Sequence, residues 1–214
     1  MEHLDIKKIL EDLSLKRPLF HSEADFQHEL AWEIHLKHPQ AKLRLEKPSG
    51  NPEKKERIDI EVILNNQITM IELKYKKTKL EYKHIDEHFR LSNDGAQDIT
   101  RYDFIKDILR LEEYIDRNPE AVGYAIILTN DDLYHRDSNG KCSAAFFINE
   151  GRELKKGIEM NWHENTSIGT KKSREKSHVL SNDYNIKWEK YSEINIAKKN
   201  IYKSLIIHIP SKKQ

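Results

Sequence analysis

Asp59, Glu72 and Lys74 are the residues of this sequence whose types and spacing could do chemistry. Two carboxylates that face each other repel and stabilise nothing by themselves, but a divalent cation between them would offset the repulsion. Carboxylate oxygens suit Mg²⁺ or Mn²⁺, and a neighbouring lysine could stabilise negative charge that develops on a substrate. The alternative interpretation is that all three are ordinary charges on an exposed strand face.

A β-hairpin would bring these side chains together. Two alternating runs, RIDIEVIL and QITMIELKY, are separated only by Asn65 and Asn66, and asparagine tolerates the left-handed backbone angles of a two-residue turn. Counting outward from that turn places Asp59 opposite Glu72, with their Cβ atoms about 4.5–5.5 Å apart on one face of the sheet. Strand alternation puts Lys74 on the same face.

A helix expected over residues 23–38 carries a further carboxylate. Glu23 and Gln27 continue the apolar stripe of this helix, whereas Glu29 and Glu33 fall off the stripe and are expected to be solvated. A carboxylate on a core stripe needs a partner, because an unpaired buried charge is costly. The alternative for Glu23 is a favourable interaction with the helix N-terminus. The stripe itself consists of Phe26, Leu30, Ala31 and Ile34.

A second helix, expected from about Ala96 to Arg117, repeats this pattern. Gln97 and Arg101 stand at the head of its apolar stripe. Such polar groups could contact a substrate or make structural hydrogen bonds, and the sequence leaves both roles open. The apolar members of the stripe are Phe104, Ile108, Leu111 and Ile115.

The remaining elements complete an α/β pattern. An amphipathic helix is expected for MEHLDIKKILEDL, a buried strand for AVGYAIILT, a shorter strand for SAAFFI and a final strand for KSLIIHI. A charged helix or loop is expected before Phe89, and residues 151–183 are expected to form polar loops. We expect one domain, with its core at about 20–150 and a less regular, basic C-terminal extension at about 151–214 packing on it.

Charge and composition narrow the classes of protein. The 37 basic and 36 acidic side chains nearly cancel, but residues 151–214 carry 14 basic against 7 acidic side chains. This asymmetry favours either a nucleic-acid partner or a solubilising surface. No apolar run approaches the roughly 18–20 residues that cross a bilayer, and the N-terminus lacks the apolar core of a signal peptide. A cytoplasmic protein with no membrane association is therefore expected. The single Cys142 excludes an internal disulfide framework.

The ordered set of residues resembles the PD-(D/E)XK nuclease superfamily. The segments SEADFQHEL, RIDIEV and IELKYK carry the resemblance, which covers about residues 22–129. Ile58 stands where the name-giving motif has proline. The resemblance implies a restriction-endonuclease-like fold, in which helices flank a central mixed β-sheet. It also implies that Asp59 and Glu72 bind Mg²⁺, with Mn²⁺ as a substitute, and that Lys74 positions or activates the attacking water.

Further residues take supporting roles in this comparison. Glu23 matches the helix carboxylate of the family as a further metal ligand, and Gln27 follows it as in several branches. Gln97 and Arg101 correspond to variable polar positions of the second core helix. By alternation Lys76 shares the face of Lys74 and could contact a phosphate backbone.

A metal-dependent nuclease that hydrolyses phosphodiester bonds in DNA is therefore the leading hypothesis. A catalytically inactive nucleic-acid-binding or regulatory module that keeps the nuclease fold is the alternative. The sequence leaves a homodimer open.

Overall fold

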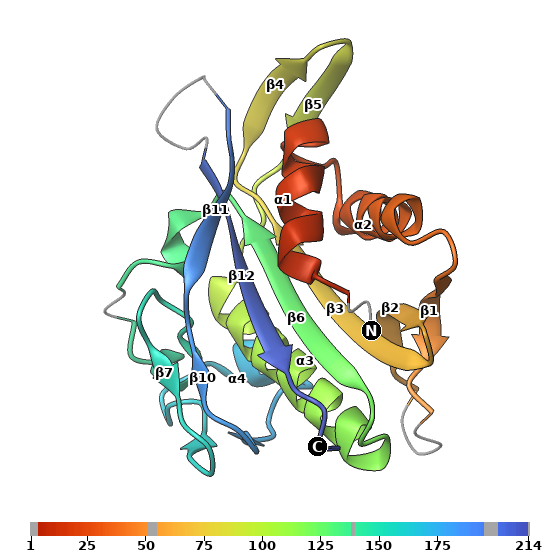
Figure 1. The fold of residues 1–214 in the computed structure, drawn as a ribbon. Helices are drawn as coiled ribbons and strands as arrows, with labels where there is room; N and C mark the ends of the chain where they lie inside the picture. Colours follow the sequence, from red (N-terminus) through yellow and green to blue (C-terminus); the bar gives the residue numbers. More distant parts are fainter. Residues whose placement is uncertain (1–3, 51–54, 138–139, 195–200, 214) are drawn as a thin grey trace.

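A six-stranded mixed sheet forms the centre of the computed structural model, which describes residues 4–50, 55–137, 140–194 and 201–213 (Figure 1). The strands lie in the order β1-β2-β3-β6-β12-β11. β3 and β6 run parallel, and the other neighbours are antiparallel. The bounds are β1 (Lys42–Pro48), β2 (Arg57–Leu64), β3 (Gln67–Lys76), β6 (Val122–Thr129), β11 (Trp188–Glu193) and β12 (Ile201–Ile209).

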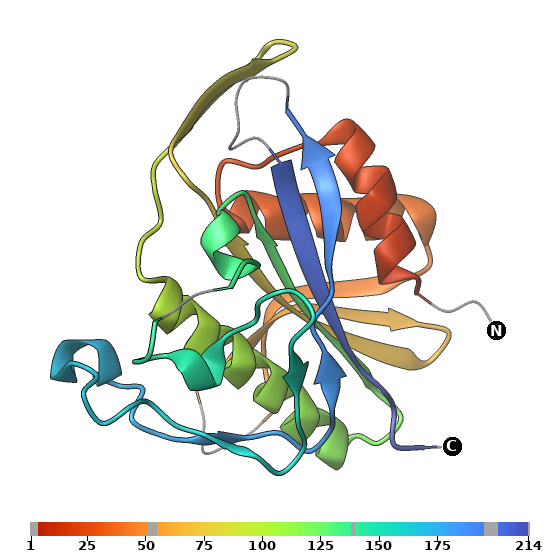
Figure 2. The ribbon, with the colours of Figure 1, turned by 90° about the vertical axis from the view of Figure 1, so that its left-hand side faces the viewer.

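Helices cover both faces of this sheet. α1 (Ile6–Lys16) and α2 (Glu23–Lys37) lie on one face, and α3 (Gln97–Arg117) lies on the other (Figures 1 and 2). Strand alternation divides β3 between two apolar cores, since Ile71 packs on the α1 and α2 side and Met70 on the α3 side. The protein is therefore an α/β structure, as the sequence predicts. Among the described residues, no helix is long and apolar enough to cross a membrane.

The start of α2 follows its sequence signal. Ser22 is the N-cap, and its hydroxyl accepts a hydrogen bond from the backbone N–H of Asp25 at 3.1 Å. The four apolar stripe residues are buried as predicted. The prediction that Glu33 is solvated was wrong: its side chain is 3% exposed, and the ammonium group of Lys16 lies 2.7 Å from its carboxylate. Packing of α1 against α2 supplies this partner, which the sequence of α2 alone does not reveal.

The hairpin register is confirmed between Leu64, which pairs with Gln67, and Ile60, which pairs with Ile71. Both turn asparagines have positive φ, 52° and 66°. Beyond Ile60 the ladder to β3 ends, although β2 remains paired with β1 as far as Arg57. The edge of β3 past this point therefore needs hydrogen-bond partners other than β2.

Two predicted elements were wrong. The segment before Phe89 forms a hairpin of β4 (Leu80–His84) and β5 (Glu87–Leu91), not a helix or loop, and it projects from the body (Figures 1 and 2). SAAFFI forms the 3₁₀ turn Ala144–Phe146 instead of a strand. Its Phe146 packs edge-on against Tyr102 of α3, with ring centroids 5.1 Å apart, so burial against a helix explains the apolar run.

The segment after this turn contains short elements within its loops. Another 3₁₀ turn, at Asp132–Tyr134, lies before the turn at Ala144–Phe146. The others are β7 (Glu153–Leu154), β8 (Glu159–Met160), α4 (Ile168–Lys171), β9 (His178–Val179) and β10 (Tyr184–Asn185). The strand predicted for KSLIIHI is β12, which lies inside the central sheet between β6 and β11.

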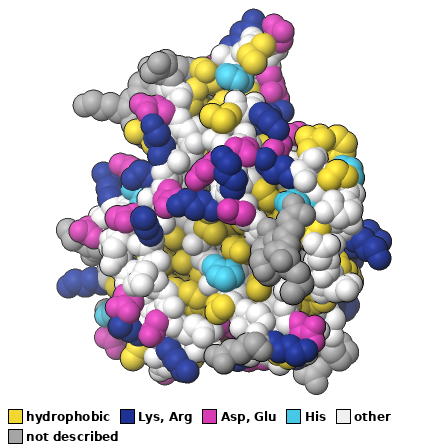
Figure 3. All heavy atoms as spheres, viewed as in Figure 1, with side chains coloured by type: hydrophobic (Ala, Val, Ile, Leu, Met, Phe, Trp, Pro, Cys, Tyr) yellow, Lys and Arg dark blue, Asp and Glu magenta, His cyan; other side chains and the backbone are white. Residues whose placement is uncertain are grey.

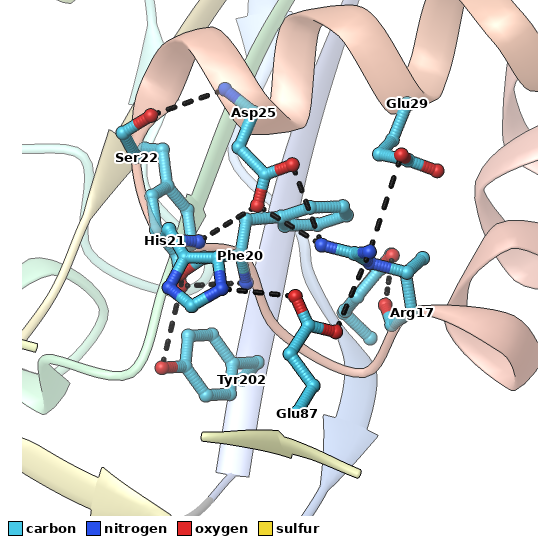
Figure 4. Close-up of polar contacts among 10 residues, drawn as sticks. Arg17, Phe20, His21, Ser22, Asp25, Glu29, Glu87 and Tyr202 are labelled. Carbon is cyan, nitrogen blue, oxygen red and sulfur yellow. Dashed lines mark hydrogen bonds and ion pairs between the residues drawn. The ribbon is translucent and has the colours of Figure 1, made fainter. Parts of the chain in front are cut away.

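Ion pairs fasten the projecting hairpin to the loop between α1 and α2 (Figure 4). The imidazole Nε2 of His21 lies 2.9 Å from the carboxylate of Glu87, and the His21 ring stacks on Phe89 with centroids 4.4 Å apart. Arg17 pairs with Asp25 at 3.0 Å and with Glu87 at 3.5 Å. The hairpin is therefore anchored, through Glu87 and Phe89 of β5, to the start of α2.

The sheet face below α1 carries hydrophobic side chains at the surface (Figure 3). Tyr124 and His208 stack there with ring centroids 4.9 Å apart, and both line a hollow of about 330 Å³. This hollow lies on the side of the sheet opposite α3.

Candidate functional site

A hollow of about 470 Å³ lies beside α3, where β2 leaves β3. Asp59 of β2 and Lys74 of β3 line it, and Lys106, Asp107 and Arg110 of α3 line it from the helix side. The hollow is therefore lined by two of the three residues expected to do chemistry and by a set of charged residues on α3.

Asp59 is half-buried and fixed by the backbone of β3. Its Oδ2 accepts a hydrogen bond of 2.6 Å from the N–H of Leu73, which is one of the donors that β2 no longer pairs. Burial raises the pKa of Asp59 to about 6, although this hydrogen bond and the nearby charge of Lys74 act in the opposite direction.

Glu72 is 1% exposed, and the guanidinium Nη2 of Arg110 lies 2.5 Å from its Oε2. Neither of its carboxylate oxygens accepts a hydrogen bond of ordinary geometry from the described residues. Burial is the main cause that raises the pKa of Glu72 well above its usual value, and the charge of Asp107 adds to it. Glu72 is therefore a buried carboxylate that only a cation can keep ionised.

Lys74 lies against Asp107, with its ammonium nitrogen 2.7 Å from Oδ2. Burial opposes the charge of Lys74, but the carboxylates of Asp107 and Glu23 outweigh it and raise the pKa of the ammonium group. The side chain is therefore protonated at neutral pH. It can supply positive charge and hydrogen-bond donors, but not a base.

Glu23 approaches from α2 and accepts a hydrogen bond of 2.8 Å from the N–H of Tyr75. Gln27 donates hydrogen bonds to the backbone carbonyl of Asp59 at 2.7 Å and to Glu46 at 2.8 Å. Glu23 and Asp59 thus accept hydrogen bonds from two backbone N–H groups of β3 that β2 does not pair. Gln27 fixes the backbone of Asp59 through its carbonyl. Lys76 is half-buried on β3 and is not among the residues that line the hollow.

The two polar residues at the head of α3 lie elsewhere. Gln97 donates a hydrogen bond of 2.8 Å to Asp131. Arg101 donates to the carbonyl of Leu133 at 2.5 Å, and its guanidinium carbon lies 4.9 Å from the ring centroid of Phe147. Neither residue lines the hollow. Both connect α3 to the segments after β6, so the structural role left open by the sequence is the one that the structure displays.

Asp107 and Arg110 are site residues that sequence reasoning missed. Asp107 is 4% exposed and receives Lys74 on one oxygen and Arg110, at 2.8 Å, on the other. A signal was present: Asp107 is spaced three residues after Phe104 and four before Leu111, on the edge of the apolar stripe of α3. The argument that singled out Glu23, a carboxylate on a core stripe, applies equally to this position.

The carboxylates of this cluster are suitable ligands for a divalent cation. In the structure, however, they contact positively charged side chains of the protein itself. In the described part of the chain, no three carboxylate, imidazole or thiol side chains form a ready-made metal site. Arg110 contacts Glu72, and Lys74 contacts Asp107. A metal ion would therefore compete with Arg110 for Glu72, whose oxygens lack other partners.

Asp59 should make stability fall with rising pH. Because its folded-state pKa of about 6 exceeds the usual 3.8, the folded protein favours the protonated form, and this contribution is lost as the pH rises from about 4 to about 6. Relative to Asp59→Asn, the wild-type Tm should decline over this window. The resemblance implies that the ionised carboxylate is a metal ligand, and in that case Mn²⁺ should raise the Tm more at about pH 7 than at about pH 5. Parallel Tm curves for both proteins, measured by calorimetry, would contradict this.

Comparisons with protein-family models, curated proteins and solved structures return no match to this chain.

Proposed function

We propose that this protein is a divalent-metal-dependent nuclease that hydrolyses phosphodiester bonds in DNA. The observation that carries the proposal is that Asp59 and Lys74 line one hollow where β2 leaves β3 and that both interact electrostatically with the buried Glu72. The charge of Asp59 raises the pKa of Glu72, and the charge of Lys74 lowers the pKa of both carboxyl groups, so the three groups interact electrostatically. Buried acids with perturbed pKa values beside an open hollow are typical of catalytic sites.

The architecture supports the same proposal. A mixed sheet between helices, with the two carboxylates on neighbouring strands and a third, Glu23, on the helix packed alongside, agrees with a restriction-endonuclease-like fold. The divergence of β2 from β3 leaves the site open toward the hollow.

Asp59 and Glu72, with Glu23 nearby, are the oxygen ligands that would hold Mg²⁺ or Mn²⁺. A bound ion of this kind lowers the pKa of water and neutralises charge on a phosphate. Lys74 contributes a fixed positive charge that stabilises the anionic phosphate as negative charge develops. Asp107 holds the ammonium group of Lys74 in place, and Gln27 fixes the backbone at Asp59.

One observation favours a second candidate, a nucleic-acid-binding or regulatory module without turnover. The pairs Arg110–Glu72 and Lys74–Asp107 close the charge network without a metal ion. If these pairs persist in solution with Mg²⁺ present, Glu72 is not free to act as a ligand.

A cleavage assay separates the two candidates. We expect the wild-type protein to cut a panel of linear, nicked, branched and single-stranded DNA only when Mg²⁺ or Mn²⁺ is present and not in EDTA, since the ion neutralises the phosphate. The products are resolved on denaturing gels. An uncut panel, with metal binding shown independently by calorimetry, would favour the binding module.

A further inference from the structure

A second hollow, of about 380 Å³, adjoins the site along α3. It shares Glu56, Lys106 and Arg110 with the hollow that contains Asp59 and Lys74. Its opposite wall is the segment 173–178, which lies on the α3 side of the sheet after α4 (Figure 2). We call this second space the outer hollow. It is a continuation of the candidate site in one direction, and its volume is within the range of sites for small molecules.

The wall of the outer hollow is held firmly to α3. Arg174 makes two hydrogen bonds, of 2.9 and 2.8 Å, to the carboxylate of Asp103. The hydroxyl of Tyr102 donates to the carbonyl of Lys176 at 2.9 Å, and the indole of Trp162 donates to the carbonyl of Arg174 at 2.8 Å. A paired, two-point contact of this kind fixes orientation as well as distance. The outer hollow is therefore preformed.

An aromatic side chain with an unsatisfied ring nitrogen lines this space. His178 is 4% exposed, and its ring lies 4.2 Å from that of Tyr102 between centroids. Its Nε2 is buried and makes no hydrogen bond of ordinary geometry with the described residues. Burial lowers the pKa of His178, so the imidazole is neutral at neutral pH.

The charges around the outer hollow balance. Lys106, Arg110 and Lys176 line it together with Glu56, Glu113 and Glu175. Because the charges balance, the lining offers no net attraction to a polyanionic backbone and suits a neutral group better than a phosphate. A carboxylate at such a site accepts hydrogen bonds from the exocyclic amino groups of bases, as glutamate and aspartate do with cytosine.

We propose that the outer hollow binds one unpaired, amino-bearing nucleobase (cytosine, adenine or guanine) of the strand whose phosphodiester lies beside Lys74. This inference rests on the proposed function and names its substrate class. The base must be unpaired, because in a duplex its hydrogen-bonding edge is already engaged and its faces are stacked. Lys106, exposed at the junction of the two hollows, is placed to contact the intervening phosphate. Thymine, which has no exocyclic amino group, is disfavoured.

Binding measured in EDTA tests the inference independently of cleavage. Fluorescence anisotropy with single-stranded oligonucleotides of about eight nucleotides, within the span of known single-strand sites, compares dC, dA and dT sequences and a duplex. We expect dC and dA to bind at least about fivefold more tightly than dT, the lower end for a well-made contact to a base edge, and more tightly than the duplex. Equal affinity for dC and dT, or a preference for the duplex, would overturn the proposal.

Two variants assign the preference to this space. Glu113→Gln alters an exposed lining residue and should reduce the ratio of dC to dT affinity toward one, while Glu11→Gln, on α1 across the sheet, should leave it unchanged. His178→Leu should weaken binding of all single strands if its fold, checked by circular dichroism, is intact. Unchanged preference in Glu113→Gln would overturn the assignment.

The outcome is separable from that of the proposed function. A base preference in EDTA without any metal-dependent cleavage would contradict the proposed nuclease function and support the outer hollow as a binding site. Metal-dependent cleavage without a base preference would support the proposed nuclease function and contradict base binding in the outer hollow.

Discussion

Lys74→Ala should reduce metal-dependent DNA cleavage by about 10²–10³-fold, the loss typical when one preorganised donor to developing charge is removed. Metal binding should persist, because an ammonium group is not a ligand. Asp59→Ala should lose both cleavage and metal binding, because it removes a carboxylate oxygen donor. Cleavage is measured as a single-turnover rate, and metal binding as the rise in Tm on adding Mn²⁺.

The matched control is Lys76→Ala, which removes a lysine two residues further along β3 and outside the hollow. Its cleavage rate should stay within about tenfold of wild type, as for one contact to the phosphate backbone. Because Lys74 pairs with the buried Asp107, Lys74→Met is a second variant that keeps the aliphatic stem. Equal losses at Lys74 and Lys76 would show that general charge, and not a positioned group, supports cleavage.

The parts of the fold that the sequence predicted well are those determined by local patterns. The Ser22 cap, the two-residue turn at Asn65 and the buried stripe of α2 each depend on residues close together in the chain. The errors arose where tertiary contacts decide. An apolar run became a 3₁₀ turn because Phe146 packs on α3, and Glu33 is buried because Lys16 of α1 reaches it.

The candidate site divides in the same way. Hairpin counting gave the correct register from Leu64 to Ile60, because it follows from the geometry of the turn. The predicted pairing of Asp59 with Glu72 lies beyond Ile60, where the ladder between β2 and β3 has ended. The partners of these groups come from α3, more than thirty residues along the chain from Lys74 to Asp107 and Arg110. Which face of α3 meets β3 depends on the packing of the whole sheet, and no local spacing specifies it.

Arg110 should be the residue of the site with the largest effect on stability. Arg110→Ala leaves Glu72, which is 1% exposed, without the cation that contacts it at 2.5 Å. Loss of one partner of a buried pair costs about 3–5 kcal/mol in free energy of unfolding. Burial already raises the pKa of Glu72, and removal of Arg110 raises it further. Since protonation relieves the unpaired charge, the destabilisation should be larger at about pH 8 than at about pH 5.

The same variant tests whether Arg110 and a metal ion compete for Glu72. In EDTA, urea denaturation should show the full loss of stability, whereas saturating Mn²⁺ should restore more stability to Arg110→Ala than it adds to the wild type. The control is Arg90→Ala on β5, whose guanidinium contacts Glu81 at the surface and should contribute at most about 1 kcal/mol. In a Glu72→Gln background, Arg110→Ala should cost much less, because the charge to be paired is gone. If Mn²⁺ stabilises the wild type and Arg110→Ala equally, Glu72 is not a metal ligand. The Arg110–Glu72 pair then has a structural role, and any cation binds elsewhere on the protein.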